Sequence, residues 1–99
     1  MLGMREAEAL KIMSALSQAT RLKVFVLLAN AEEGGLAASD IADQLGTPRN
    51  LMSAHLAVLS KAGVIHSTKS GRTVTYRPVL SAVAELGEYL AALGTSKLS

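Results

Sequence analysis

Residues 38–77, ASDIADQLGTPRNLMSAHLAVLSKAGVIHSTKSGRTVTYR, decide the fold of this 99-residue chain. The stretch begins with a pattern that predicts a short helix over residues 40–45. Ser39 is a candidate N-cap for this helix, and Gly46 is positioned to end it. We therefore expect a compact helix that stops abruptly and leaves the chain free to turn.

A longer second helix is expected to begin immediately after that glycine. Thr47 is a candidate cap, and Pro48 suits the first helical position, where its missing N–H costs nothing. The pair Ala62-Gly63 ends the helix. Its apolar face includes His55, which we interpret as a packed residue rather than a contact to a ligand; the other members are Leu51, Met52, Leu56 and Leu59.

The spacing of these residues fits two helices that cross closely. Such a pair needs a small residue where the helices cross, a glycine in the turn, and apolar residues that lock the crossing. Ala42 and Gly46 fill the first two roles, and the apolar set is Ile41, Leu45, Met52 and Leu56. Residues 39–61 thus predict a helix–turn–helix, whose second helix turns its polar face outward.

A β-hairpin is expected to follow directly. Residues 64–68 and 73–77 alternate and are rich in β-branched side chains, and Lys69-Ser70-Gly71-Arg72 separates them. Tyr76 is expected to pack this hairpin against the helices, whereas His66 is expected on the surface. The segment 64–77 is therefore predicted to form a basic wing.

Three further helices are expected outside this region. One covers about residues 5–16, and a nearly all-apolar helix then runs to the pair Gly34-Gly35. The last covers residues 79–93. The chain is thus predicted to be mainly α with one β-hairpin, and to form a single domain over residues 1–99.

Charge is distributed unevenly along the chain. Between residues 44 and 84 there are five positive side chains and no Asp or Glu, whereas residues 1–43 carry four positive and six negative groups. The formal net charge of +2 therefore conceals a basic segment. Such a segment on a small domain indicates a polyanionic partner.

Composition argues against several other classes of protein. The chain has no cysteine, which excludes disulfides, thiolate metal sites and thiol redox sensing. No apolar run approaches the roughly 20 residues needed to span a bilayer, and no segment of signal-peptide type is visible, so we expect a cytoplasmic protein without a membrane partner. There is no GxSxG motif, metal-ligand cluster or Gly-rich phosphate loop. We expect neither an enzyme nor a cofactor.

The polar face of the second predicted helix suits double-stranded DNA. Arg49 can donate two hydrogen bonds to guanine, and Asn50 can pair with adenine. Ser53 and Ala54 are short enough for close approach to the bases. The expected DNA-binding residues of the helix and wing are Thr47, Arg49, Asn50, Ser53, Ala54, Lys69, Arg72 and Arg77.

The wing residues in this set are expected to act differently from those of the helix. Lys69 and Arg72 at the hairpin tip would follow the DNA backbone or reach into the minor groove, and Arg77 would contact a phosphate. Arg21, near the start of the second expected helix of the chain, is either a salt-bridging cap or a phosphate contact, and we favour the cap.

The runs LSQATRLKVFVLL, TPRNLMSAHLAVLSKAGVI and GRTVTYR resemble the ArsR/SmtB (arsenic-repressor) family of bacterial transcription factors over about residues 8–93. The resemblance implies a winged helix–turn–helix homodimer that represses an operon until an effector releases it. It also implies a two-fold symmetric, palindromic operator, read by two recognition helices roughly 34 Å apart. The family dimerises through its first and last helices, so the implied interface residues are Leu10, Met13, Leu80, Val83, Leu86 and Leu90.

The metal sites familiar in that family are absent from this sequence. Ala37 and Ser39 stand where its thiolate sensors have cysteines, and the last helix has no histidine. Glu85 and Glu88 are the only ligand candidates there, and we interpret them as a solvated face. The effector therefore remains open between a small organic molecule near the dimer interface, an unusual metal site between subunits, and none.

The main alternative is a winged-helix protein-interaction module without DNA or metal sensing. The acid-free polar face of the second helix argues against it, because a protein-binding module has no reason to exclude acidic residues there.

Overall fold

The computed structural model describes residues 3–95. Within them, the chain forms five helices and a small antiparallel sheet with the strand order β1-β3-β2. The elements are α1 (Glu6–Leu16), α2 (Ala19–Ala29), β1 (Leu36–Ala37), α3 (Ala38–Leu45), α4 (Arg49–Lys61), β2 (Ile65–Ser70), β3 (Thr73–Pro78) and α5 (Leu80–Gly94). The predicted fold, a mainly helical winged helix–turn–helix, is confirmed.

The first two helices begin with side-chain caps. The Glu8 Oε1 atom accepts a hydrogen bond from the Arg5 backbone N–H at 3.0 Å, and Gln18 Oε1 accepts one from the Arg21 backbone N–H at 2.8 Å. These bonds satisfy amides that have no partner inside a helix.

The second helix is shorter than the sequence pattern predicted. It ends at Ala29, where the Asn30 side chain donates to the Val26 carbonyl at 2.8 Å, so the expected extension to Gly34-Gly35 is wrong. Gly35 has a different role: its φ is 77°, and a Cβ there would lie 2.4 Å from the Tyr76 carbonyl oxygen. This glycine lets the loop after α2 pass closely over β3.

The helix–turn–helix forms around buried residues of both helices. Ile41 and Ala42 of α3 are buried, as are Met52, Leu56 and Leu59 of α4. Gly46 adopts φ 64° at the end of α3, and the Thr47 N–H donates to the Ala42 carbonyl at 3.0 Å. Glycine reaches this left-handed conformation without a steric cost, which explains the tight turn.

Both predicted caps in this region are wrong. Ser39 lies inside α3, which begins at Ala38 because Leu36 and Ala37 are already held extended as β1. Pro48, and not Thr47, is the residue that precedes α4. The Thr47 hydroxyl makes only a 3.5 Å hydrogen bond to the Leu45 carbonyl.

The wing is a longer hairpin than predicted, with a shorter loop. Ser70 pairs with Thr73, so only two residues connect the strands, and Gly71 takes φ 62° between them. Such short hairpin loops favour positive φ because this matches the twist of the strands. A third strand, β1, pairs Leu36 with Tyr76, an addition that the sequence pattern did not predict.

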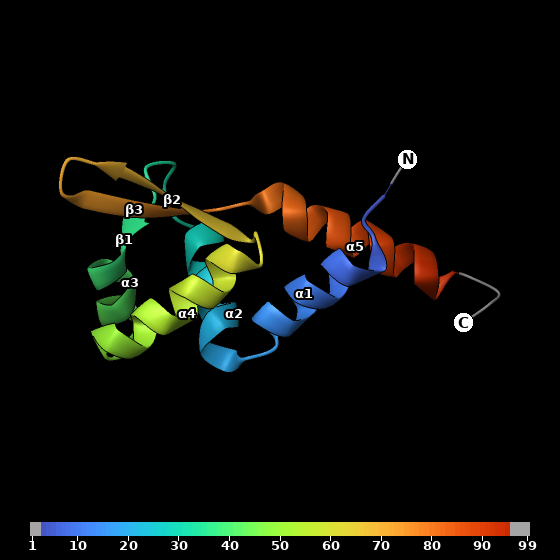
Figure 1. Cartoon of the computed structure of the whole chain (residues 1–99), viewed down its shortest axis with the longest axis horizontal. Coiled ribbons are helices and arrows are strands. Elements are labelled where there is room, and N and C mark those ends of the chain that lie inside the picture. The colour runs from blue at the N-terminus through green and yellow to red at the C-terminus, as the bar shows by residue number, and fades with distance from the viewer. Residues whose placement is uncertain (1–2, 96–99) are drawn as a thin grey trace.

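The molecule is elongated, with principal extents of 50 × 24 × 21 Å. Figure 1 shows the wing tip and the start of α4 at one end of the long axis, and α1 and α5 at the other. Buried residues from all five helices and from β2 form one core that connects these ends. Within residues 3–95, no single helix is long and apolar enough to cross a membrane; α1 and α2 meet that test only as a pair bent by 98°.

Candidate nucleic-acid interface

The α4 helix has one buried face and one exposed polar face. Met52, Leu56 and Leu59 are buried, whereas Arg49, Asn50, Ser53 and Ala54 are exposed. The two sets separate because residues three or four apart in a helix share a face. The four predicted base-reading residues are therefore brought together over the first turns of α4.

Arg49 is held by a weak contact with the preceding helix. Its Nη2 atom lies 3.7 Å from Asp43 Oδ2, and both side chains are exposed. Exposed pairs of this kind contribute between zero and about 1 kcal/mol. The guanidinium is thus loosely positioned beside the turn, and little energy is needed to release it to another partner.

The wing tip presents two more cations. Lys69 and Arg72 are exposed on either side of Ser70-Gly71, at the same end of the molecule as the start of α4. No carboxylate within the described part of the chain lies within ion-pair distance of either one, since Arg49–Asp43 is the only ion pair there.

Arg77 is placed differently from the tip residues. It is half-buried, its Nε atom donates to the Glu33 carbonyl at 3.1 Å, and its Nη1 atom donates to Thr68 Oγ1 at 2.6 Å. These bonds tie the wing to the loop after α2, a structural role that no local sequence pattern indicates because Glu33 is 44 residues away. Thr47, also a predicted DNA contact, is half-buried in the turn.

Arg21 of α2 contacts both α1 and α4. Its Nε atom donates to the Ala15 carbonyl of α1 at 2.6 Å, and its Nη1 atom lies 3.5 Å from Nδ1 of His55 in α4. Arg21 therefore closes the end of α1 through a hydrogen bond, and the salt bridge expected of it does not form within residues 3–95. His55 is half-buried, and its packing role stays a prediction.

The opposite end of the molecule exposes leucines. Of the six predicted interface residues, Leu10 is 58% exposed, Leu80 57% and Leu90 42%. Met13 and Val83 are half-buried against the core, and Leu86 is only 7% exposed. Leu86 therefore already packs inside its own chain, while the other three leucines leave large apolar surfaces on α1 and α5.

Candidate metal ligands are dispersed. Across residues 3–95, no group of three or more His, Cys, Asp or Glu side chains is placed to hold a metal ion.

A helix–turn–helix with an exposed polar second helix and an adjoining basic hairpin defines a winged helix–turn–helix DNA-binding domain. Residues 16–68 match the protein family described as "Helix-turn-helix domain". The matched segment contains the whole of α2, α3 and α4 and most of β2.

Individual relatives identify the family within this class. The HTH-type transcriptional repressor SmtB of Mycobacterium tuberculosis is 33% identical over 86 residues, which cover 79% of this chain and 62% of that protein. An ArsR-like transcriptional regulator from Rhodococcus sp. RHA1 superposes with a TM-score of 0.80 at 30% identity, covering 89% of this chain and 80% of that one.

A third relative is described as a homodimeric winged helix–turn–helix DNA-binding domain of a possible ArsR-family regulator from Mycobacterium bovis. It has a TM-score of 0.70 at 25% identity and covers 99% of this chain and 94% of that one. The chain belongs to the ArsR/SmtB family of winged helix–turn–helix transcriptional regulators.

Proposed function

We propose that this regulator is a homodimeric repressor that binds a two-fold symmetric DNA operator and is released by an effector. The observation that carries the proposal is the separation of two surfaces along the molecule. One end exposes the polar face of α4 and the cations of the wing, and the other exposes apolar side chains of α1 and α5. The first surface suits a nucleic acid and the second suits a copy of the same chain.

On the DNA, α4 enters the major groove with its first turns leading. Arg49 and Asn50 then read base edges, while Ser53 and Ala54 allow the helix to approach closely. Lys69 and Arg72 contact the phosphate backbone or the minor groove beside it. Arg77 supports the wing through its bonds to Glu33 and Thr68, and its remaining Nη2 group is available to a phosphate.

The dimer forms through α1 and α5, where Leu10, Leu80 and Leu90 of one chain pack against the same elements of another. Burial of apolar area gains about 25 cal/mol per Å², so three largely exposed leucines per chain give the association a substantial driving force. The homodimeric relative from Mycobacterium bovis supports this assembly, and the repressor from Mycobacterium tuberculosis supports repression.

Fluorescence anisotropy with labelled DNA from upstream of the protein's own gene tests the proposal. We expect tight binding at low salt that weakens as salt increases. If each protomer neutralises about three to five phosphates, log K falls against log salt by about 0.9 for each contact. Binding that does not depend on salt, or no binding to any DNA, would contradict it. Recovery of one stoichiometric protein partner without DNA affinity would favour the protein-interaction alternative.

A further inference from the structure

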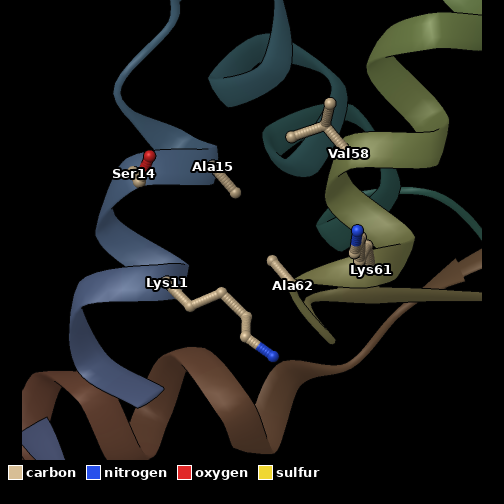
Figure 2. Close-up of a pocket in the computed structure, with 6 residues that line it drawn as sticks. All are labelled: Lys11, Ser14, Ala15, Val58, Lys61 and Ala62. Carbon is tan, nitrogen blue, oxygen red and sulfur yellow. The ribbon is translucent and has the colours of Figure 1, made fainter. Parts of the chain in front are cut away.

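A hollow of about 250 Å³ lies between the dimerisation end of the molecule and the recognition helix. Its walls are Lys11, Ser14 and Ala15 from α1, Val58 and Lys61 from the end of α4, and Ala62 directly after it. Figure 2 shows Ala15, Val58 and Ala62 facing one another across the space, with a lysine side chain beside each wall. Neither the DNA-binding surface nor the leucines of the proposed dimer account for this hollow.

The hollow is lined by apolar side chains and by two positively charged lysines. Its facing groups are methyl groups of two alanines and a valine, together with the aliphatic stems of the lysines. Between residues 3 and 95, no carboxylate lies within ion-pair distance of the Lys11 or Lys61 ammonium group. Lysine stems commonly cover apolar surface while the charged head reaches outward, so both ammonium groups are placed to meet an anion at the rim.

A neighbouring hollow restricts where that anion can lie. Lys11 and Ala62 also border a second space, which is lined by Glu8 of α1 and Glu85 of α5. Two carboxylates repel an anion on that side. An anionic group in the first hollow is therefore directed toward Lys61, with its apolar body against Ala15 and Val58.

We propose that this hollow binds a small carboxylic acid with an apolar body, such as a medium-chain fatty acid. The volume is below the roughly 300–1,000 Å³ of pockets that hold drug-sized ligands, which limits the ligand to a small one. A phosphate is a poorer fit, because the only side-chain donors of the lining, the Ser14 hydroxyl and the two ammonium groups, are too few to replace the water around a doubly charged group, and the alanines and valine would face no apolar part. A carboxylate needs only the rim ammonium groups, and its hydrocarbon part replaces water against the alanines and valine.

The position of the hollow gives such a ligand a route to regulation. It contacts α1, which carries the exposed Leu10, and the last turn of α4, whose first turns carry Arg49. Ala15 is also the residue whose carbonyl accepts the 2.6 Å hydrogen bond from Arg21, and Arg21 reaches His55 of α4. A ligand that fits one spacing of α1 and α4 better than another shifts the population toward that spacing. This regulatory step rests on the proposed repressor function.

Isothermal titration of the free protein with octanoate tests the site without DNA. We expect saturable binding, with octanol much weaker because it lacks the charge. The double variant Lys11→Gln/Lys61→Gln should bind octanoate about 2- to 30-fold more weakly, the range expected for loss of two exposed ion pairs. Lys23→Gln is the matched control, since Lys23 borders a different apolar hollow on α2, and it should bind like the parent.

A second variant tests the space itself. Ser14 is exposed, so Ser14→Leu fills the hollow without disturbing a buried residue, and it should abolish octanoate binding while the circular dichroism spectrum is retained. Absence of saturable binding to the parent, equal binding by the double variant, or loss of binding only in Lys23→Gln would each overturn the proposed site.

The regulatory step is tested by operator anisotropy with and without saturating octanoate. We expect the operator affinity of the parent to change at least fivefold and that of Ser14→Leu to stay constant. Coupling of this size is within the range usual for allosteric regulators, about 5- to 150-fold. Octanoate binding with unchanged operator affinity would overturn the regulatory step. Failure to bind DNA even without octanoate would instead contradict the repressor function, and the calorimetric result for the site would be unaffected.

Discussion

The two ends of the molecule expose different side chains, which are mainly polar at one end, where Leu51 is the exception, and include large leucines at the other. At one end, Arg49, Asn50, Lys69 and Arg72 stand in water as polar groups that are stable there without a partner. At the other, Leu10, Leu80 and Leu90 are 58%, 57% and 42% exposed, although each would gain free energy on burial. The difference indicates that the polar end is stable in water without DNA, whereas the proposed association through α1 and α5 would remove exposed apolar surface from water.

Disruption of the apolar end is expected to cause the largest loss of operator affinity. In Leu10→Glu/Leu90→Glu, four carboxylates would enter each dimer interface, where desolvation opposes them. We expect a monomer in size-exclusion chromatography with light scattering. Operator affinity should fall on the order of 100-fold, since the second half-site contact is no longer intramolecular.

Leu22→Glu is the control for this change, because Leu22 is 48% exposed but lies on α2, away from the proposed interface. It should remain a dimer. A double variant that stays dimeric, or a control that also dissociates, would place the interface elsewhere on the molecule.

The second-largest loss of operator affinity is expected when a side chain proposed to read a base is removed. Arg49→Ala is expected to cost about 1–3 kcal/mol of operator binding and to relax the preference at one base pair of each half-site. Competition anisotropy with single-base operator variants measures both effects. Arg5→Ala, a cation at the start of α1, is the control and should bind like the parent. Equal losses on operator and random DNA would show that Arg49 contacts only the backbone.

Substitutions at the wing tip should cause a smaller loss of DNA affinity, and this loss should not depend on the DNA sequence. Lys69→Ala and Arg72→Ala are each expected to weaken binding to operator and random DNA alike, and to reduce the salt slope by about one contact. Anisotropy at several salt concentrations provides the slope. If either variant changes base preference instead, the wing reads the minor groove by sequence.

The smallest effect is expected at Asp43. Asp43→Asn removes the 3.7 Å partner of Arg49 together with a negative charge beside the proposed DNA-binding surface. Binding to random DNA should strengthen by up to about 1 kcal/mol, while thermal stability stays nearly constant because both side chains are exposed. Asp40→Asn on the same helix is the comparison. Weaker operator binding by Asp43→Asn would mean that the carboxylate positions Arg49 for base reading.

Most of the fold could be predicted, but its local boundaries could not. Helical periodicity located α1, α4 and α5, and the alternation of residues 64–77 located the wing. The predicted N-cap at Ser39 is wrong because β1, a strand of two residues, fixes the chain before α3 and leaves no alternating pattern to detect. The predicted cap at Thr47 is wrong because α4 begins one residue later, after Pro48. The early end of α2 at Asn30 depends on one side-chain hydrogen bond to the Val26 carbonyl.

For the candidate site too, some features could be predicted from the sequence and others could not. The exposure of Arg49, Asn50, Lys69 and Arg72 followed from helical spacing and from their place in the hairpin, although their contacts with DNA stay predictions. The bonds of Arg77 to Glu33 and Thr68 did not follow from any local pattern, because one partner lies on a distant loop.

By itself, the sequence determined the helix–turn–helix, the hairpin and the concentration of positive charge in residues 44–84, because each depends on spacing along one short segment. Only the tertiary structure decided that Leu86 belongs to the core while Leu10 and Leu90 do not, and that Lys11 and Lys61 border one hollow. The physical reason is that periodicity tells which face of a helix is apolar. The packing of distant elements decides which part of that face another element covers.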